Sequence, residues 1–233
     1  MKIALFGIAD IKLGKHNLKD PRLDEAHKLV EADKKTSAQA DVIGDDQLLD
    51  ADGILTSQDG KADLILKDLE FVETRLGRDP QPAERAALEK IQALLEGEKF
   101  LFNAGLAAED LQAVAAHSFY TNKPVTVATP EDLQNPEALL LRAFAEAGYI
   151  SFLTVGGKEN RAWPIRKGTT AWEAAGSIHT DMQKGFIRAE VTSFADFAAA
   201  GGETQAKRAG KQRLELKQYV VQDYDVVNFR FNK

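Results

Sequence analysis

A glycine and two lysines follow the first apolar run of the chain and could bind phosphate. The run ends near Gly7, and Lys12, Gly14 and Lys15 come next. A phosphate-binding P-loop needs a glycine, four residues, Gly-Lys and then Ser or Thr, so that consecutive N–H groups surround phosphate and the hydroxyl holds magnesium. Here six residues separate Gly7 from Gly14, and His16 stands at the hydroxyl position. The spacing argues against a working phosphate loop and leaves Lys12, Gly14 and Lys15 as a weak alternative nucleotide site.

Histidine and carboxylate side chains offer little further chemistry. His179-Thr180-Asp181 puts a histidine beside a carboxylate, as general-base catalysis requires, but adjacent residues rarely face each other and no serine lies in a nucleophile elbow. We expect a helix-end role, with Thr180 or Asp181 capping backbone N–H groups. The chain has four scattered histidines and no cysteine. The sequence therefore predicts no catalytic residue, no metal site and no cofactor.

Basic residues are concentrated in the last part of the chain. Residues 1–149 carry 17 Lys+Arg against 27 Asp+Glu, whereas residues 150–233 carry 13 against 9. Residues 150–233 therefore have a net charge of +4, and their basic residues are interleaved with aromatic residues. This pattern permits phosphate contacts and base stacking on RNA, while the acidic residues 1–149 repel phosphate. Composition alone assigns most of these aromatic residues to core or rim positions. The candidate RNA-binding or partner-binding residues are Lys158, Arg161, Arg166, Lys167, Lys184, Arg188, Lys211 and Arg213.

The elements that position these residues follow from the hydrophobic pattern. In residues 1–148, short apolar runs predict strands at 2–8, 40–44, 53–56 and 123–128. Helices are predicted from about residue 20 and over 108–116 and 136–147. Apolar residues at helical spacing on both sides of a proline-containing break predict a helical hairpin at about 61–99. The pattern indicates a small α/β domain with a helical insertion.

The second predicted domain begins at residue 149, after Gly148 and the shift in charge. Strands are predicted at 149–155, 161–165, 186–192, 219–221 and 226–231 around a helix near 170–178, which suggests a β-grasp module. No run approaches the roughly 18 uncharged apolar residues of a membrane span, and the start lacks the apolar run of a signal peptide. We expect a cytoplasmic protein without a membrane partner, and the absence of cysteine is compatible with that compartment.

Several runs in the C-terminal part are specific enough to identify a family. Residues 161–171 read RAWPIRKGTTA, residues 174–181 read AAGSIHTD, and residues 184–191 read KGFIRAEV. Together with the ending at 219–232, these ordered runs resemble the TGS module of YchF-type, Obg-like P-loop NTPases. The resemblance implies a ubiquitin-like β-grasp fold and association with ribosome, RNA or a translation factor, and no DNA partner is expected. The chain departs from the family at Leu216 and Tyr224, where glycine is usual, so we expect two turns to differ.

Separate segments of the N-terminal part are similar to the same family. Residues 20–24 resemble the segment after its first switch region, and residues 63–78 resemble the first helix of its coiled-coil insertion. Residues 122–133 resemble the strand that ends in its base-recognition motif, but Ala-Thr-Pro-Glu at 128–131 stands where the asparagine motif belongs. The segments between these pieces are mostly missing. We therefore interpret the chain as a truncated member with a degenerate nucleotide domain, 1–148, and an intact TGS domain, 149–233.

Three functions follow from this interpretation. The first is a non-catalytic protein that contacts ribosome, RNA or a translation factor through the TGS domain and has lost nucleotide binding. The second is a residual ATP or GTP hydrolase with an atypical phosphate site. The third is a regulator that binds a protein partner through its helical hairpin. No feature of the sequence sets the oligomeric state.

Overall fold

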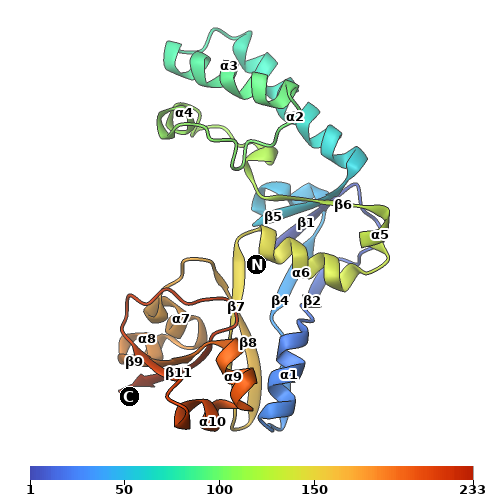
Figure 1. The fold of residues 1–233 in the computed structure, drawn as a ribbon. Helices are drawn as coiled ribbons and strands as arrows, with labels where there is room; N and C mark the ends of the chain where they lie inside the picture. Colours follow the sequence, from blue (N-terminus) through green and yellow to red (C-terminus); the bar gives the residue numbers. More distant parts are fainter. Residues whose placement is uncertain (233) are drawn as a thin grey trace. The chain divides into compact units, whose positions relative to one another are not determined.

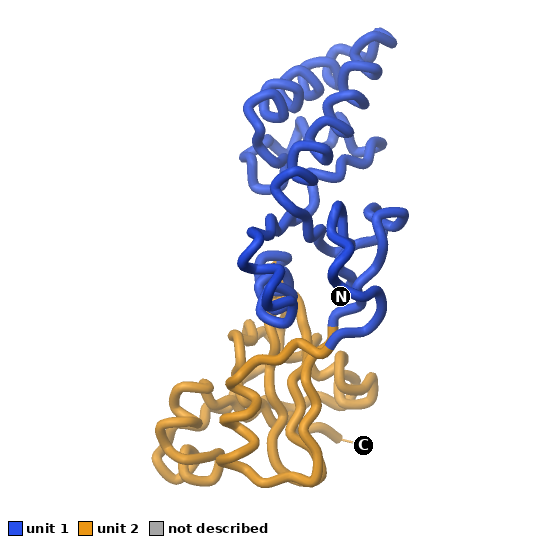
Figure 2. Tube along the Cα trace, turned by 90° about the vertical axis from the view of Figure 1, so that its right-hand side faces the viewer, with its two compact units in different colours: residues 1–16, 40–147 blue, residues 17–39, 148–233 orange. Residues whose placement is uncertain are grey.

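The computed structural model describes residues 1–232 and divides the chain into two compact units, coloured separately in Figure 2. Unit 1 comprises residues 1–16 and 40–147, and unit 2 comprises residues 17–39 and those from 148 onward. The sequence predicts a single division at residue 148. The structure differs because residues 17–39 belong to the same compact unit as the C-terminal part.

Unit 1 is built on a five-stranded sheet in the order β2-β4-β1-β5-β6 (Figure 1). Its strands are β1 (Lys2–Phe6), β2 (Gly14–Asn17), β4 (Gln39–Ile43), β5 (Gly53–Ser57) and β6 (Val125–Ala128). β1 pairs in parallel with both β4 and β5, and β5 pairs in parallel with β6. Ala4, Ile54 and Leu55 of the central strands are fully buried, which explains their continuous apolar sequence.

The helical part of unit 1 is dominated by two long helices, α2 (Gln58–Leu76) and α3 (Pro82–Glu96), in the region where the sequence predicts a hairpin. Val72 of α2 packs with Leu88, Ile91 and Leu95 of α3 in one apolar cluster. The shorter helices are η1 (Asp45–Asp50), α4 (Ala108–Ala113), η2 (Tyr120–Asn122), α5 (Pro130–Leu133) and α6 (Pro136–Glu146). Ion pairing adds to this packing, because the Glu84 carboxylate accepts hydrogen bonds from Arg75 at 2.6 and 2.9 Å and lies 2.7 Å from His117 Nε2.

A buried carboxylate joins α2 to the segment that leads into β6. Asp68 is 2% exposed and accepts hydrogen bonds from Tyr120 N at 3.0 Å, Thr121 N at 2.8 Å and Thr121 Oγ1 at 2.7 Å. Burial raises the pKa of Asp68, while the hydrogen bonds from Thr121 and Tyr120 oppose that rise. Because a buried carboxylate is costly unless its oxygens are satisfied, these bonds hold the middle of α2 beside η2.

Unit 2 contains a six-stranded sheet in the order β10-β9-β11-β7-β8-β3. The strands are β3 (Lys34–Thr36), β7 (Tyr149–Thr154), β8 (Glu159–Arg166), β9 (Phe186–Thr192), β10 (Arg213–Glu215) and β11 (Val226–Phe231). β7 and β8 form an antiparallel hairpin, β11 pairs in parallel with β7, and β9 pairs antiparallel with β11 and β10. The strand predicted at 219–221 is wrong, because this segment makes only an isolated bridge between Thr170 and Val220.

Helices cover both faces of the unit 2 sheet. α7 (Ala171–Ile178) buries Ala174 and Ala175 against Phe152 and Val227 on one face. A capping box between Thr170 and Glu173 starts this helix. The remaining helices of the unit are α1 (Pro21–Leu29), α8 (Thr180–Lys184), α9 (Phe194–Ala200) and α10 (Glu203–Arg208). α1 contacts β8 and α9, and α10 lies near β9 on the face opposite α7.

An aromatic residue anchors α1 to the C-terminal part of unit 2. The Arg22 guanidinium lies 3.7 Å from the centre of the Tyr224 ring and makes ion pairs with Asp20 at 2.7 Å and Asp223 at 2.8 Å. Tyr224 is 2% exposed and adopts φ +62°, and its ring meets Phe194 edge to face. The resemblance predicts an altered turn here, and the structure shows a tyrosine in a left-handed conformation with a buried ring.

Candidate functional site

The weak nucleotide site around Lys12, Gly14 and Lys15 lacks the backbone of a phosphate loop. After β1 the chain bends through residues 7–13 and enters β2, an edge strand, instead of a helix. Lys12 and Lys15 are exposed, and His16 Nε2 lies 2.7 Å from the Lys12 carbonyl oxygen. A phosphate cradle relies on successive N–H groups that open a helix. The segment after β1 does not supply that arrangement.

The segment after β6, where the resemblance would place the base-recognition motif, is occupied by its own hydrogen bonds. Thr129 and Asp132 form a capping box, with Thr129 N donating to Asp132 Oδ2 at 2.8 Å and Asp132 N donating to Thr129 Oγ1 at 3.3 Å. Arg142 donates to the same carboxylate at 2.8 Å and to the Val127 carbonyl at 3.1 Å. Ligands of open α/β sheets bind beyond the carboxyl ends of the strands. At this strand end the Thr129 and Asp132 side chains are engaged with each other and with Arg142 Nη2, whereas Arg142 Nε is buried without a hydrogen-bond partner among the described residues.

Two of the eight basic candidates lie on β8 and stack on aromatic rings. The Arg161 guanidinium is 3.9 Å from the centre of the Trp163 ring and 3.8 Å from a carboxylate oxygen of Glu159. The Arg166 guanidinium is 4.7 Å from the centre of the Tyr149 ring. These contacts hold both side chains along the β7–β8 hairpin and reduce their availability to a ligand.

Two further candidates are engaged in ion pairs. Lys211 Nζ lies 3.2 Å from Asp196 Oδ1. Arg213 Nε donates to Glu215 at 3.1 Å, and its Nη2 donates to the Tyr219 hydroxyl at 3.0 Å. Both residues therefore have structural partners within unit 2, which the sequence spacing does not reveal.

The other four candidates, Lys158, Lys167, Lys184 and Arg188, have exposed side chains with no ion pair or hydrogen bond to any residue in the described part of the chain. They come from the β7–β8 turn, the end of β8, the end of α8 and β9. The side chains of Arg208 and Lys217 are likewise exposed and make no ion pair or hydrogen bond within residues 1–232. The only sequence signal that could have selected those two is their basic type in a basic segment.

Arg188 stands beside Arg230 in the register of β9 and β11. Arg230 is neutralised by Glu190, which is 5% exposed, also accepts a hydrogen bond from Asn228 at 2.9 Å and lies 3.7 Å from Lys207. Burial acts to raise the pKa of the Glu190 carboxyl, but Arg230 and Lys207 hold that pKa below its usual value. The charge of Arg230 is therefore compensated, whereas that of Arg188 is not.

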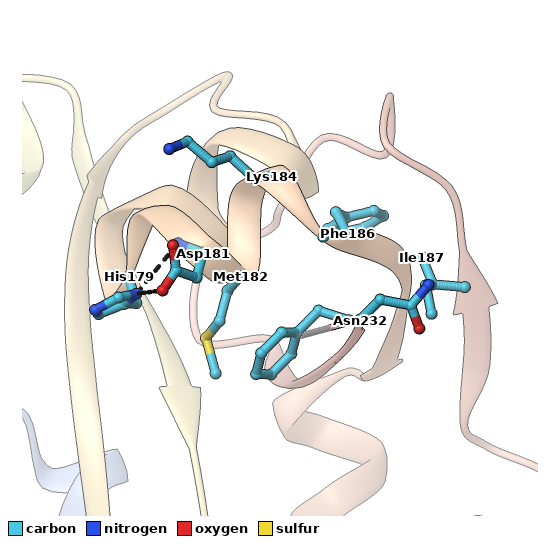
Figure 3. Close-up of a pocket in the computed structure, with 9 residues that line it drawn as sticks. His179, Asp181, Met182, Lys184, Phe186, Ile187 and Asn232 are labelled. Carbon is cyan, nitrogen blue, oxygen red and sulfur yellow. Dashed lines mark hydrogen bonds and ion pairs between the residues drawn. The ribbon is translucent and has the colours of Figure 1, made fainter.

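Beside these cations lies a groove with a volume of about 960 Å³, which we name the terminal groove. It lies where α8, the start of β9 and the end of β11 meet, and it is lined by His179, Asp181, Met182, Lys184, Gly185, Phe186, Ile187, Phe231 and Asn232. Figure 3 shows His179 and Asp181 at one side of this groove and Ile187 and Asn232 at the other, with Met182 between them.

His179 caps α8 itself, which corrects the expectation that Thr180 or Asp181 would do so. Its Nδ1 accepts a hydrogen bond from Asp181 N at 3.1 Å, because the ring folds back over the first turn of the helix. Nδ1 is also 3.5 Å from the Asp181 carboxylate. Within residues 1–232, no three His, Asp or Glu side chains gather as a metal site would require, and no helix is long and apolar enough to cross a membrane.

Comparisons with known proteins agree on one family. Residues 149–232 match the family model YchF-GTPase_C, described as a protein of unknown function (DUF933). The ribosome-binding ATPase YchF of Haemophilus influenzae is 34% identical over 232 residues, covering 73% of this chain and 64% of that protein. YchF of Bacillus subtilis, also named a ribosome-binding ATPase, is 49% identical over 41% of this chain and 26% of its own. Obg-like ATPase 1 of Danio rerio is 46% identical over 42% of this chain and 26% of its own.

A solved structure has the same fold. The YchF GTPase of Schizosaccharomyces pombe superposes with a TM-score of 0.76, covering 99% of this chain and 97% of that chain at 18% identity. The chain spans less than two thirds of the curated relatives that it matches. The sequence matches show that this chain is similar to YchF and Obg-like ATPases, and its mixed α/β fold is shared with the YchF GTPase of Schizosaccharomyces pombe.

Proposed function

We propose that this chain binds the ribosome through RNA contacts made by unit 2. The observation that carries the proposal is the set of exposed side chains Lys158, Lys167, Lys184 and Arg188, which have no partner among the described residues. Free cations on a surface attract phosphate, because binding releases the counterions condensed on the nucleic acid. The name ribosome-binding ATPase, which relatives carry, agrees with this proposal and with a cytoplasmic location. A translation factor bound by the same surface is the alternative partner.

The test is co-sedimentation with ribosomes after charge reversal. We expect binding to be lost when four residues are changed together, namely K158E, K167E, K184E and R188E. A control with the same change in net charge reverses four exposed basic residues of unit 1, namely K12E, K15E, R78E and K99E. The control should bind as the wild type does. Wild-type affinity should also fall with salt at a slope of roughly -0.7 to -0.9 per phosphate contact.

Equal binding by the unit 2 variant and the wild type would reject this surface. The helical hairpin of α2 and α3 would then become the better candidate for the contact. If the unit 1 control loses binding as strongly as the unit 2 variant, unit 2 is not the specific surface, and either total charge or the hairpin, in which Arg78 and Lys99 lie, determines binding. Both outcomes are measured in the same sedimentation experiment.

We further propose that the chain does not bind ATP or GTP and has no hydrolase activity. The proposal is supported by the course of the chain after β1, which enters β2 without opening a helix, and by the closed capping box after β6. Calorimetric titration with either nucleotide at millimolar concentration, with magnesium, should give no saturable heat. A saturable micromolar site would overturn the proposal and support the residual hydrolase, consistent with the ATPase name of the relatives. Loss of that site in K12A/K15A would then locate it.

A further inference from the structure

We propose that the terminal groove binds one nucleotide of single-stranded RNA, with the base on its apolar floor and the adjoining phosphate at Lys184. The inference rests on the proposed RNA-binding function of unit 2 and assigns a position and a ligand class to it.

The floor of the groove is apolar, and its solvent-exposed part is Ile187, since Phe186 is only 7% exposed. Met182, Phe186, Ile187 and Phe231 supply it, and Ile187 is 47% exposed. Phe231 pairs with Phe186 and Arg230 pairs with Arg188, so Ile187 has no partner in the register between β9 and β11. Such β-bulges re-aim side chains and are common next to functional sites. Apolar and aromatic side chains with open faces accept stacked bases of any sequence, because every base has a π face.

The rim supplies hydrogen-bonding groups suited to the edge of a base. Because His179 Nδ1 accepts the hydrogen bond from Asp181 N, the neutral ring carries its proton on Nε2, which is free to donate. The Asn232 carboxamide at the opposite side offers both a donor and an acceptor, and its side chain has no partner among residues 1–232. RNA bases in single strands are read on such edges by hydrogen bonds.

The charge around the groove favours a phosphate. Lys184 lines the groove, and Arg188 follows Ile187 directly in β9. Neither cation has an acidic partner in the described chain, and Asp181 is the only acidic residue among those that line the groove. An acidic peptide could use the same cations. RNA is favoured because its phosphates repeat along the chain, and unit 2 carries further unpaired cations away from the groove, among them Lys158 and Lys167 at the two ends of β8.

The test measures binding of a fluorescently labelled ten-nucleotide single-stranded RNA to the full chain by anisotropy. Ile187→Glu places a carboxylate on the exposed floor, and we expect it to weaken RNA binding about tenfold or more. Leu214→Glu is the matched control, because Leu214 is also exposed, at 55%, and lies on the neighbouring strand β10 outside the groove. The control should stay within about twofold of the wild type. Both variants should keep the wild-type melting temperature, since neither side chain is buried.

A second probe separates base recognition from charge. An abasic oligonucleotide of the same length should bind Ile187→Glu and wild-type protein equally weakly, because no base enters the groove. If Ile187→Glu matches Leu214→Glu while the unit 2 charge-reversal variant loses the ribosome, the groove inference is wrong and the proposed function stands. If the wild type binds neither RNA nor ribosomes, both are wrong. Binding of an acidic apolar peptide in place of RNA, lost in Ile187→Glu, would also overturn the inference.

Discussion

Replacement of Tyr224 by glycine sets two opposing effects against each other in unit 2. Tyr224 has φ +62°, a conformation that favours glycine, so Tyr224→Gly relieves backbone strain. The same substitution deletes a ring that is 2% exposed, stacks on Arg22 at 3.7 Å and meets Phe194 at 5.7 Å between ring centres. The sign of the change in stability therefore depends on which effect is larger.

The free energy lost with the tyrosine side chain is larger than the backbone strain that glycine would relieve. A left-handed conformation costs a residue other than glycine about 1–2 kcal/mol, which is the most that Tyr224→Gly can recover. Loss of a buried aromatic side chain costs about 3–5 kcal/mol. Loss of the cation–π contact with Arg22 adds about 0.5–2 kcal/mol. We therefore expect the unfolding free energy of unit 2 to fall by roughly 1.5–6 kcal/mol.

Tryptophan fluorescence during urea unfolding measures this effect selectively, because both tryptophans, Trp163 and Trp172, belong to unit 2. Arg22→Ala and the double variant complete a cycle, and the coupling between Arg22 and Tyr224 should be about 0.5–2 kcal/mol. A Tyr224→Gly variant at least as stable as the wild type would refute the reasoning. A coupling near zero would show that α1 is not held through this ring.

Three further substitutions test the packing of the two units. In Asp68→Ala, two backbone N–H groups and the Thr121 hydroxyl lose their acceptor, so urea denaturation should show unit 1 destabilised by about 2–4 kcal/mol. Hydrogen bonding from Arg75 lowers the pKa of Glu84 to about 2, so the stability that this carboxylate contributes is present above about pH 4.5 and is lost as the pH falls toward 2. Glu84→Gln should therefore flatten the pH dependence of the urea midpoint between pH 5 and 3, and an unchanged slope would contradict the assignment. In Gly185→Ala the new Cβ would lie 2.0 Å from the Asn232 carbonyl oxygen, so the melting temperature should fall by an amount corresponding to about 1–3 kcal/mol.

Local sequence determined the elements whose side chains are buried in a regular pattern. The strands predicted at 186–192 and 226–231 have the bounds of β9 and β11, and the helix predicted near 170–178 corresponds to α7. In α7 one face meets the core, so small apolar residues recur at the helical period, whereas β9 is buried over residues 189–192 on both faces and is recognised by its apolar and β-branched residues. The strands β2 and β3, with the sequences GKHN and KKT, carry no such signal because they are short, polar edge strands.

Only the tertiary structure determined which basic side chains have no acidic partner and are therefore available to bind a ligand. Lys211 and Lys184 are the same residue type in the same basic segment, but the fold brings Asp196 to Lys211 and no acidic residue of the described chain to Lys184. The assignment of residues 17–39 to unit 2 likewise follows from contacts with residues far along the chain, namely the pairing of β3 with β8 and the packing of α1 on β8 and α9, with Arg22 on Tyr224 as one such contact. Composition and periodicity give the type of each residue and the pattern of polar and apolar residues along the chain. Partners that are distant in sequence are chosen by the packing of the whole unit, because hydrogen bonds and ion pairs form only where folding brings the groups within about 4 Å.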